Sequence, residues 1–353
     1  MRRAALARGT ASTNQVYRVE GPGVPTPRTL TLRPGSGTRR AVNRVIAWLP
    51  DRIDRRVRVA AWLSFLAQTI IIATGGAVRL TGSGLGCPTW PMCTADSLVT
   101  TPEMGIHGVI EFGNRLMTGV VGIVALLVLL SIWRLRRERR DLWRLAVIVL
   151  LGIIAQAVVG GVTVWTGLNP FIVGFHYVAS LVLVCVTAAY LVRLDATPGA
   201  RELAAPRWFA TLTHATTAVL AISIVFGVLT TASGPHSGDA DAGRTGFNAE
   251  LLEHVHAWPG YALFALTVVL ATAAWRLRLQ VARWMVALLA IELVQIAVGL
   301  YQARNGLPPL AVGVHMVLAA LMAAAMTVVV LKLKRPVATD ASADDAPVAA
   351  SAR

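Results

Sequence analysis

Charged residues are scarce in this chain of 353 residues: only 14% are Asp, Glu, Lys or Arg, against roughly 25% in a soluble domain. Hydrophobic residues make up 55%, and the mean hydropathy is +0.62. A globule surrounded by water could not bury so much apolar surface. The apolar residues fall in blocks of about 20, the length that crosses the hydrocarbon core of a bilayer. The composition excludes a soluble enzyme and a disordered chain, and it predicts a polytopic membrane protein.

Cysteine is also scarce, because the chain has only three. That number is too small for a disulfide framework. Cys87 and Cys93 share one connection between apolar blocks, and Cys185 lies inside a block. The first block begins only near Val59, so we expect no cleavable signal peptide and a first helix that is retained as an anchor.

The apolar blocks predict eight transmembrane helices, and the charges between them predict their orientation. Segment 134–144 carries six Arg, whereas segment 81–106 carries no Lys or Arg. The positive-inside rule therefore places both termini in the cytoplasm and segment 81–106 outside. The same rule explains the net charge of +15 without a nucleic-acid partner. The predicted helices are 59–80, 107–133, 144–166, 172–194, 208–232, 251–275, 281–302 and 310–331.

An internal repeat predicts how these helices are grouped. Segments 156–178 and 295–317 align without a gap, and the alignment pairs Gln156 with Gln295 and His176 with His315. Repeats with an even number of helices keep one orientation. We therefore predict an all-α polytopic membrane protein with eight transmembrane helices in two tandem, same-orientation four-helix bundles. The expected domains are a disordered basic cytoplasmic arm (1–58), a first bundle (59–194), a cytoplasmic linker (195–207), a second bundle (208–332) and a disordered cytoplasmic tail (333–353).

Three histidines lie inside predicted helices near their outer ends. His176 and His315 are equivalent in the repeat, and His256 lies at a similar depth on the helix at 251–275. Two imidazoles from facing helices of a bundle can bind the two faces of one haem iron. A hydrogen bond between helices is the alternative. Because burying ionisable groups in a membrane is costly and the pattern is duplicated, we favour haem ligation by His256 and His315.

The first bundle departs from this pattern. The residue aligned with His256 is Asn114, a poor iron ligand, and His107 lies about 10 Å farther out on the same helix. This asymmetry suggests a six-coordinate haem in the second bundle and a looser or open site in the first. Glu111 should border the first site, although an intrahelical ion pair with Arg115 is the alternative. The remaining His and Glu253 are expected to be structural.

These residues resemble the haem A synthase family. The resemblance covers about residues 59–332 and is carried by GGAVRLTGSGLGCPTWPMC (75–93), by IEFGNRL (110–116) and by the three helical histidines. It implies an oxidoreductase that converts haem O to haem A for cytochrome oxidase. In that reaction the C8 methyl group of the porphyrin becomes a formyl group.

The resemblance also implies roles for particular residues. His256 and His315 would bind a haem b cofactor, and His176 would bind the iron of the substrate haem in the first bundle. Glu111 matches the family's catalytic glutamate, which would assist proton movement or position the methyl group. Asn114 stands where the family has a histidine, so His176 either ligates alone or has another partner.

The first outer connection completes the implied site. Bacterial relatives often carry a cysteine pair there, which Cys87 and Cys93 match, and a disulfide is expected in the oxidising extracytoplasmic space. Arg79, Arg115 and Arg304 lie at outer helix ends and are candidates for holding the haem propionates, with snorkelling to the membrane surface as the alternative.

The resemblance places the protein in a bacterial plasma membrane, with its haem sites toward the extracytoplasmic face. Its partners would be haem O, haem O synthase (a farnesyltransferase), cytochrome oxidase assembly factors and membrane lipid. The main rival is a b-type dihaem electron-transfer cytochrome, which would need a ligand pair near each membrane face. A transporter is a third class, and the lack of broken helices with midplane polar groups counts against it.

Overall fold

The computed structural model describes residue 47 and residues 49–337. The predicted N-terminal arm up to residue 46 and the predicted tail from residue 338 lie outside the described residues. Eight helices are long and apolar enough to cross a membrane. They are α2 (Arg55–Leu80), α3 (Gly105–Ser131), α4 (Arg140–Trp165), α5 (Pro170–Leu194), α6 (Arg207–Ser233), α7 (Ala249–Arg276), α8 (Ala282–Arg304) and α9 (Pro309–Lys332).

All eight predicted helices are confirmed, and their ends lie within four residues of the predicted ones. The starts of α2 and α4 differ most, by four residues each. Helix α2 includes residues 55–58, three of them Arg, which the sequence prediction assigns to the arm. There the Asp54 side chain accepts hydrogen bonds from the backbone N–H groups of Arg56 and Val57. This N-cap starts a helix over charged residues that a hydropathy pattern passes over.

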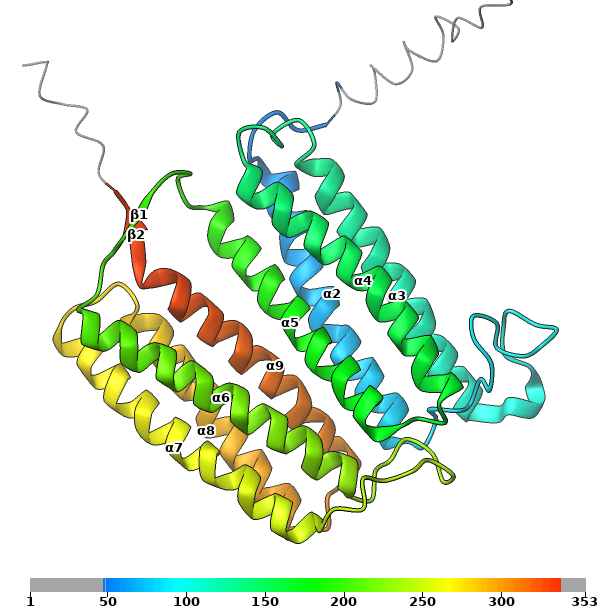
Figure 1. The fold of residues 1–353 in the computed structure, drawn as a ribbon. Helices are drawn as coiled ribbons and strands as arrows, with labels where there is room; N and C mark the ends of the chain where they lie inside the picture. Colours follow the sequence, from blue (N-terminus) through cyan, green and yellow to red (C-terminus); the bar gives the residue numbers. More distant parts are fainter. Residues whose placement is uncertain (1–46, 48, 338–353) are drawn as a thin grey trace, which may run out of the picture. The chain divides into compact units, whose positions relative to one another are not determined.

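The helices pack as two sets of four with the same neighbours in each set (Figure 1). In the first half, α2 to α5, helices α3 and α5 are diagonally opposite, since each packs against both α2 and α4. In the second half, α6 to α9, helices α7 and α9 are diagonal in the same way. The halves meet where α2 and α5 pack against α9. This arrangement agrees with the predicted duplication.

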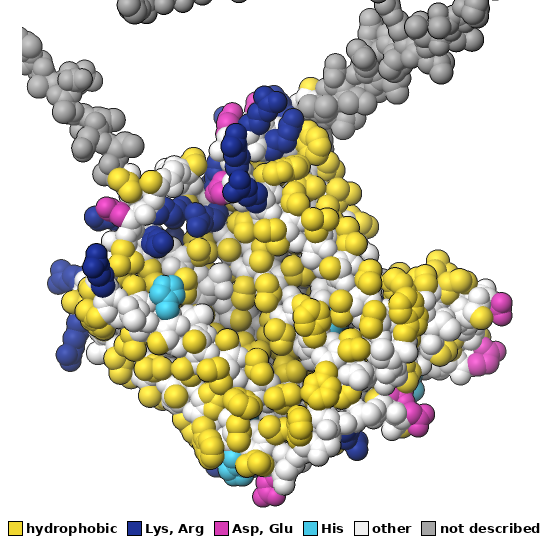
Figure 2. All heavy atoms as spheres, viewed as in Figure 1, with side chains coloured by type: hydrophobic (Ala, Val, Ile, Leu, Met, Phe, Trp, Pro, Cys, Tyr) yellow, Lys and Arg dark blue, Asp and Glu magenta, His cyan; other side chains and the backbone are white. Residues whose placement is uncertain are grey.

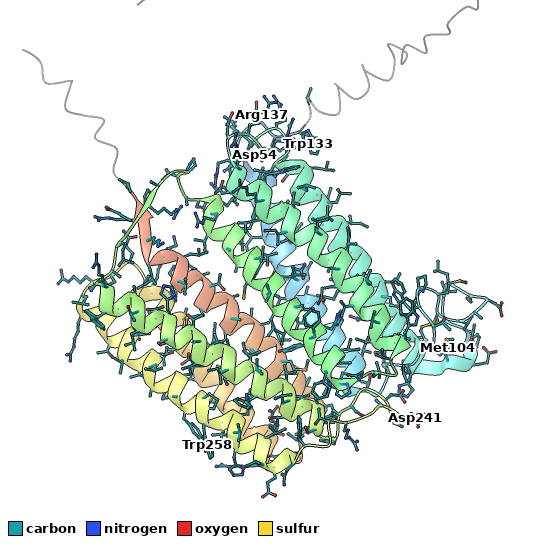
Figure 3. The ribbon with its side chains drawn as sticks, in the orientation of Figure 1. Asp54, Met104, Trp133, Arg137, Asp241 and Trp258 are labelled. Carbon is teal, nitrogen blue, oxygen red and sulfur yellow. A yellow bond between two sulfur atoms is a disulfide. The ribbon has the colours of Figure 1, made fainter. Side chains whose placement is uncertain are left out.

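The two ends of the bundle differ in charge. Hydrophobic side chains cover the middle of the visible face, and Lys and Arg gather where α2 begins and α3 ends (Figure 2). We call this the basic end, and it carries Asp54, Trp133 and Arg137 (Figure 3). The opposite end carries Met104 and Asp241 (Figure 3). We call it the disulfide end, because the loop that follows α2 there contains a disulfide between Cys87 and Cys93.

A short sheet at the basic end corrects the prediction for two segments. Strand β1 (Arg201–Leu203) pairs antiparallel with β2 (Lys334–Pro336). Arg335 also donates to Glu202 at 2.7 Å. Residues 195–207 are therefore not only a linker, and residues 334–336 do not belong to a disordered tail. Three-residue strands without an apolar alternation give no sequence signal, so the prediction missed both.

Candidate functional site

His256 of α7 and His315 of α9 face each other across the second half. Their ring centres are 6.2 Å apart and their planes cross at 81°. Both rings are half-buried. Metal–imidazole bonds are about 2.0–2.1 Å long, so two imidazoles on opposite sides of one iron stand roughly 6 Å apart between ring centres. The separation of the two rings therefore suits a pair of axial ligands.

The surroundings of His256 fix its tautomer. Its Nδ1 lies 2.9 Å from the backbone carbonyl oxygen of Ser223. A carbonyl can only accept, so Nδ1 carries the proton and the neutral ring keeps its free lone pair on Nε2. Histidine ligands commonly donate their second ring N–H to a carbonyl in this way. His256 is thus prepared to bind a metal through Nε2.

Glycines leave room for all three candidate rings. A Cβ added to Gly227 of α6 would lie 2.9 Å from Cε1 of His256, and one added to Gly299 of α8 would lie 3.1 Å from Cε1 of His315. In the first half, a Cβ at Gly160 of α4 would lie 3.6 Å from Cε1 of His176. In the second half each imidazole therefore occupies space that a side chain on the adjacent helix would fill, whereas a Cβ at Gly160 would make only ordinary van der Waals contact with His176.

The repeat reproduces the setting of His315 at His176. Each lies six residues after the proline that begins its helix. The Gln156 amide donates to the backbone carbonyl of His176 at 2.7 Å, and Gln295 donates to that of His315 at 3.2 Å. In both rings Nδ1 is buried without a hydrogen-bond partner among the described residues. A metal bound directly to Nδ1 would satisfy that atom, whereas a metal bound to Nε2 would leave it without a partner.

The first half has no second imidazole at the matching position. Asn114 stands there on α3, and its side-chain oxygen accepts a hydrogen bond from Thr74 of α2 at 2.7 Å. His107, seven residues earlier on α3, is exposed, and its Nδ1 lies 2.9 Å from Oγ of Ser83. The first half thus offers an imidazole from α5 and an amide from α3.

Glu111 lies in the first half under the disulfide loop. Only 5% of it is exposed. Its Oε2 accepts from the backbone N–H of Cys87 at 2.6 Å, and its Oε1 forms an ion pair with Arg115. The intrahelical ion pair with Arg115, the alternative expectation for Glu111, is therefore present. The carboxylate is also held against the loop.

Arg115 anchors that loop. Its guanidinium donates to Glu111 and to the backbone carbonyls of Cys87, Thr89 and Met92. These contacts occupy all five N–H groups of the guanidinium. Arg115 therefore has no N–H group left to donate to a haem propionate.

The tip of the loop packs against α4. The Trp90 ring lies on Gly161, where an added Cβ would come within 2.5 Å of it. It also meets the Trp165 ring edge to face at 5.4 Å. The disulfide loop is therefore held against α4 at the disulfide end of the bundle.

Arg79 joins the two halves at the disulfide end. It donates to the backbone carbonyls of Thr231 at 3.1 Å and His236 at 2.9 Å. The His236 ring in turn lies 2.8 Å from the carbonyl oxygen of Leu307. His236, expected to be an ordinary loop residue, therefore links two connections of the second half. Arg304 is exposed at the end of α8.

Sequence reasoning missed one buried carboxyl group. Glu292 of α8 is only 2% exposed, and its Oε1 accepts from the Thr267 hydroxyl at 2.8 Å. The available signal was an acidic residue within an apolar block, which is uncommon in membrane helices and marks candidate functional positions.

Comparisons with known proteins identify a family and similar sequences. A family model described as cytochrome oxidase assembly protein (COX15-CtaA) matches residues 58–234. A protein named "Heme A synthase" from Listeria monocytogenes is 32% identical over 127 residues, which are 36% of this chain and 41% of that relative. One of the same name from Bacillus cereus is 28% identical over 131 residues, which are 37% and 42% of the two chains. The chain thus matches about two-fifths of the length of these relatives.

Proposed function

This chain belongs to the family of cytochrome oxidase assembly proteins, and from that premise we propose that it is a haem A synthase. The relatives that are similar to part of this chain carry that name. In this role the protein oxidises the C8 methyl group of haem O to a formyl group, giving haem A for cytochrome oxidase. The observation that carries the proposal is the pair of facing imidazoles, His256 and His315. The first half repeats this arrangement with His176 and, in place of the second imidazole, Asn114.

In the second half, His256 and His315 would hold a resident haem b. Such a group supplies one-electron transfer when bound. The Ser223 carbonyl keeps the His256 lone pair on Nε2, and Gly227 and Gly299 leave space for the two rings. The 6.2 Å separation of the rings supports this assignment.

The first half holds the substrate, haem O. His176 binds its iron from α5, and the amide of Asn114 faces the site from α3. Because an amide is a poor ligand for iron, one face of the substrate iron stays open for oxygen. Glu111 lies one turn from Asn114 on the same helix and accepts or delivers the proton of the reaction. Its bond to the Cys87 N–H, at 2.6 Å, supports a fixed position for this carboxyl group.

The protein crosses a bacterial plasma membrane with both termini in the cytoplasm. Arginine-rich connections at the basic end support this orientation. The disulfide at the other end supports an extracytoplasmic location for the Cys87–Cys93 loop, because disulfides persist in oxidising compartments. Both haem sites then lie toward the extracytoplasmic face, and haem O synthase is the enzyme class that supplies the substrate.

Product analysis tests this function directly. The full chain is expressed together with a haem O-producing farnesyltransferase, and the haems extracted from the purified protein are separated by HPLC. We expect haem b together with haem A or a hydroxylated form of haem O. Two haem b molecules per chain, with no modified haem, would instead identify a b-type electron-transfer cytochrome.

A further inference from the structure

Glu292 is a buried acid whose hydrogen bonding is only half satisfied. Its Oε1 accepts from the Thr267 hydroxyl at 2.8 Å. Its Oε2 is buried and has no partner within the described part of the chain. A carboxylate in such surroundings is costly unless it is paired or neutralised by a proton. The membrane interior thus contains an acid that no contact within the fold fully explains.

The position of Glu292 relates it to the candidate haem site. Gln295 and Gly299 follow it on the same face of α8 at spacings of three and seven residues, and Gly299 adjoins the His315 ring. Glu292 therefore lies about 10 Å from the level of that ring along the helix, toward the basic end. Thr267 lies eleven residues after His256 on α7, close to three full turns, so it shares the helix face of His256.

The repeat shows that the fold does not require this polar pair. In the first half, the positions aligned with Thr267 and Glu292 are Ala125 and Ile153. Both are buried, and they pack in the same apolar cluster. An apolar pair thus fills the same place in a helix bundle of the same design. The buried acid belongs to a task that only the second half performs.

Few other titratable groups share this interior. The helices packed against α8 are α7 and α9, and of their titratable side chains only His256 and His315 are on the interior face near the site. The others on α7 and α9 are exposed or stand at the last residue of α9: Glu250, Glu253, His254, Tyr261, Arg276 and Lys332. On α8 itself, Arg283, Tyr301 and Arg304 are exposed. The described residues therefore supply no cation to balance a Glu292 carboxylate.

We propose that Glu292 is a redox-linked proton site, which takes up one proton when the iron between His256 and His315 accepts one electron and releases it on oxidation. This inference rests on the proposed binding of haem b in the second half. The proton comes from hydronium in bulk water, and the electron comes from a one-electron reductant. One O–H bond of hydronium breaks as the carboxyl O–H bond of Glu292 forms, and no other covalent bond changes.

Charge balance gives the physical reason. A ferric porphyrin carries one net positive charge and a ferrous porphyrin carries none, so a carboxylate compensates the first and a neutral acid suits the second. Compensation matters here because charges interact strongly in a medium of low dielectric constant. A proton on Oε2 would also turn it into a donor, and Gln295 Oε1, one turn away on the same face, is a buried acceptor without a partner among the described residues.

Potentiometric titration of the purified, haem b-containing full chain tests the proposal. The visible absorbance of the haem is followed during reduction with dithionite and mediator dyes, from mildly acidic to mildly alkaline pH. We expect the midpoint potential of the parent protein to fall as pH rises. In Glu292→Gln it should become independent of pH, with unchanged haem content. In the parent, a carboxyl C=O band should appear in the infrared spectrum on reduction and be missing in the variant.

Two further variants control for indirect effects. The double variant Thr267→Ala/Glu292→Ile copies the first half and should fold, bind haem b and show no pH dependence. Glu253→Gln removes an exposed acid of α7 and should keep the parent's dependence. A pH-independent parent, or a Glu292→Gln variant that retains the slope, would overturn the inference and leave the haem site standing. A parent without haem b would overturn both.

Discussion

The ring centres of His256 and His315 are 6.2 Å apart, and the two planes cross at 81°. The two residues come from diagonally opposite helices, so a flat group between the two rings would be surrounded by the four helices of the second half. In the first half, His176 occupies the position of His315. Its ring lies beside Gly160, and its backbone carbonyl accepts a hydrogen bond from the Gln156 amide. The same arrangement therefore occurs twice, with two facing imidazoles in the second half and with Asn114 at the position of one of them in the first.

Gly227 should be essential for the second-half site. Gly227→Ala adds a Cβ 2.9 Å from the His256 ring, which displaces the ring and should lower haem b content several-fold. Gly260→Ala is the matched control, because a Cβ there meets nothing within 4 Å, and in a helix it should be neutral or slightly stabilising. The test is the amount of haem b per chain in each purified variant. Equal haem content would remove the proposed role of the glycine.

Glu111→Gln should stop the chemistry without emptying the second half. General acid–base groups contribute about 100- to 10,000-fold to rates, so we expect haem A formation to fall by about 100-fold or more, with haem b unchanged. The exposed Glu103→Gln serves as the control. Haem A is measured by HPLC. Full production by Glu111→Gln would show that the carboxyl group only pairs with Arg115.

Asn114→His should close the open face of the substrate iron. The new imidazole would stand where His256 stands in the second half, so the first-half haem should become six-coordinate. We expect the reduced parent, loaded with haem O, to bind carbon monoxide, and the variant to bind far less of it. Visible difference spectra report the binding. Carbon monoxide binding of equal extent in both proteins would argue against a site with one histidine ligand.

Arg115→Lys should loosen the disulfide loop. Lysine keeps the charge but lacks the fork that reaches three backbone carbonyls, and losing these buried bonds costs about 1–3 kcal/mol. Cys87 and Cys93 are fully buried, so a thiol can reach them only when the loop opens. Reduction of the disulfide should therefore become about tenfold faster or more. The exposed Arg304→Lys should leave the rate as it is, and an unchanged rate in Arg115→Lys would contradict the anchoring role.

The sequence alone predicts the eight helices and the facing of His256 and His315. Long apolar blocks mark membrane helices because the bilayer sets their length. The repeat pairs His176 with His315 from the sequence alone, and it identifies Asn114 as the position where the two halves differ. These features are periodic or duplicated, so they can be read from residue order alone.

Other features depend on side chains that meet only after folding. Three bonds of Arg115 go to backbone carbonyls of a loop 23 or more residues earlier in the chain, and helix propensity does not predict them. The bond from Arg79 to the His236 carbonyl crosses 157 residues. Glu292 was visible as an acid in an apolar block, but its burial and its Thr267 partner required the packing of α7 against α8.

Haem content in cells that lack haem O synthase tests the central claim most directly. Without its substrate the protein should purify with one haem b per chain, in a low-spin, six-coordinate form. His256→Ala and His315→Ala should abolish this haem, and His176→Ala should keep it. Two haem b molecules per chain in the parent, or equal loss in all three variants, would contradict a resident haem in the second half and a substrate site in the first.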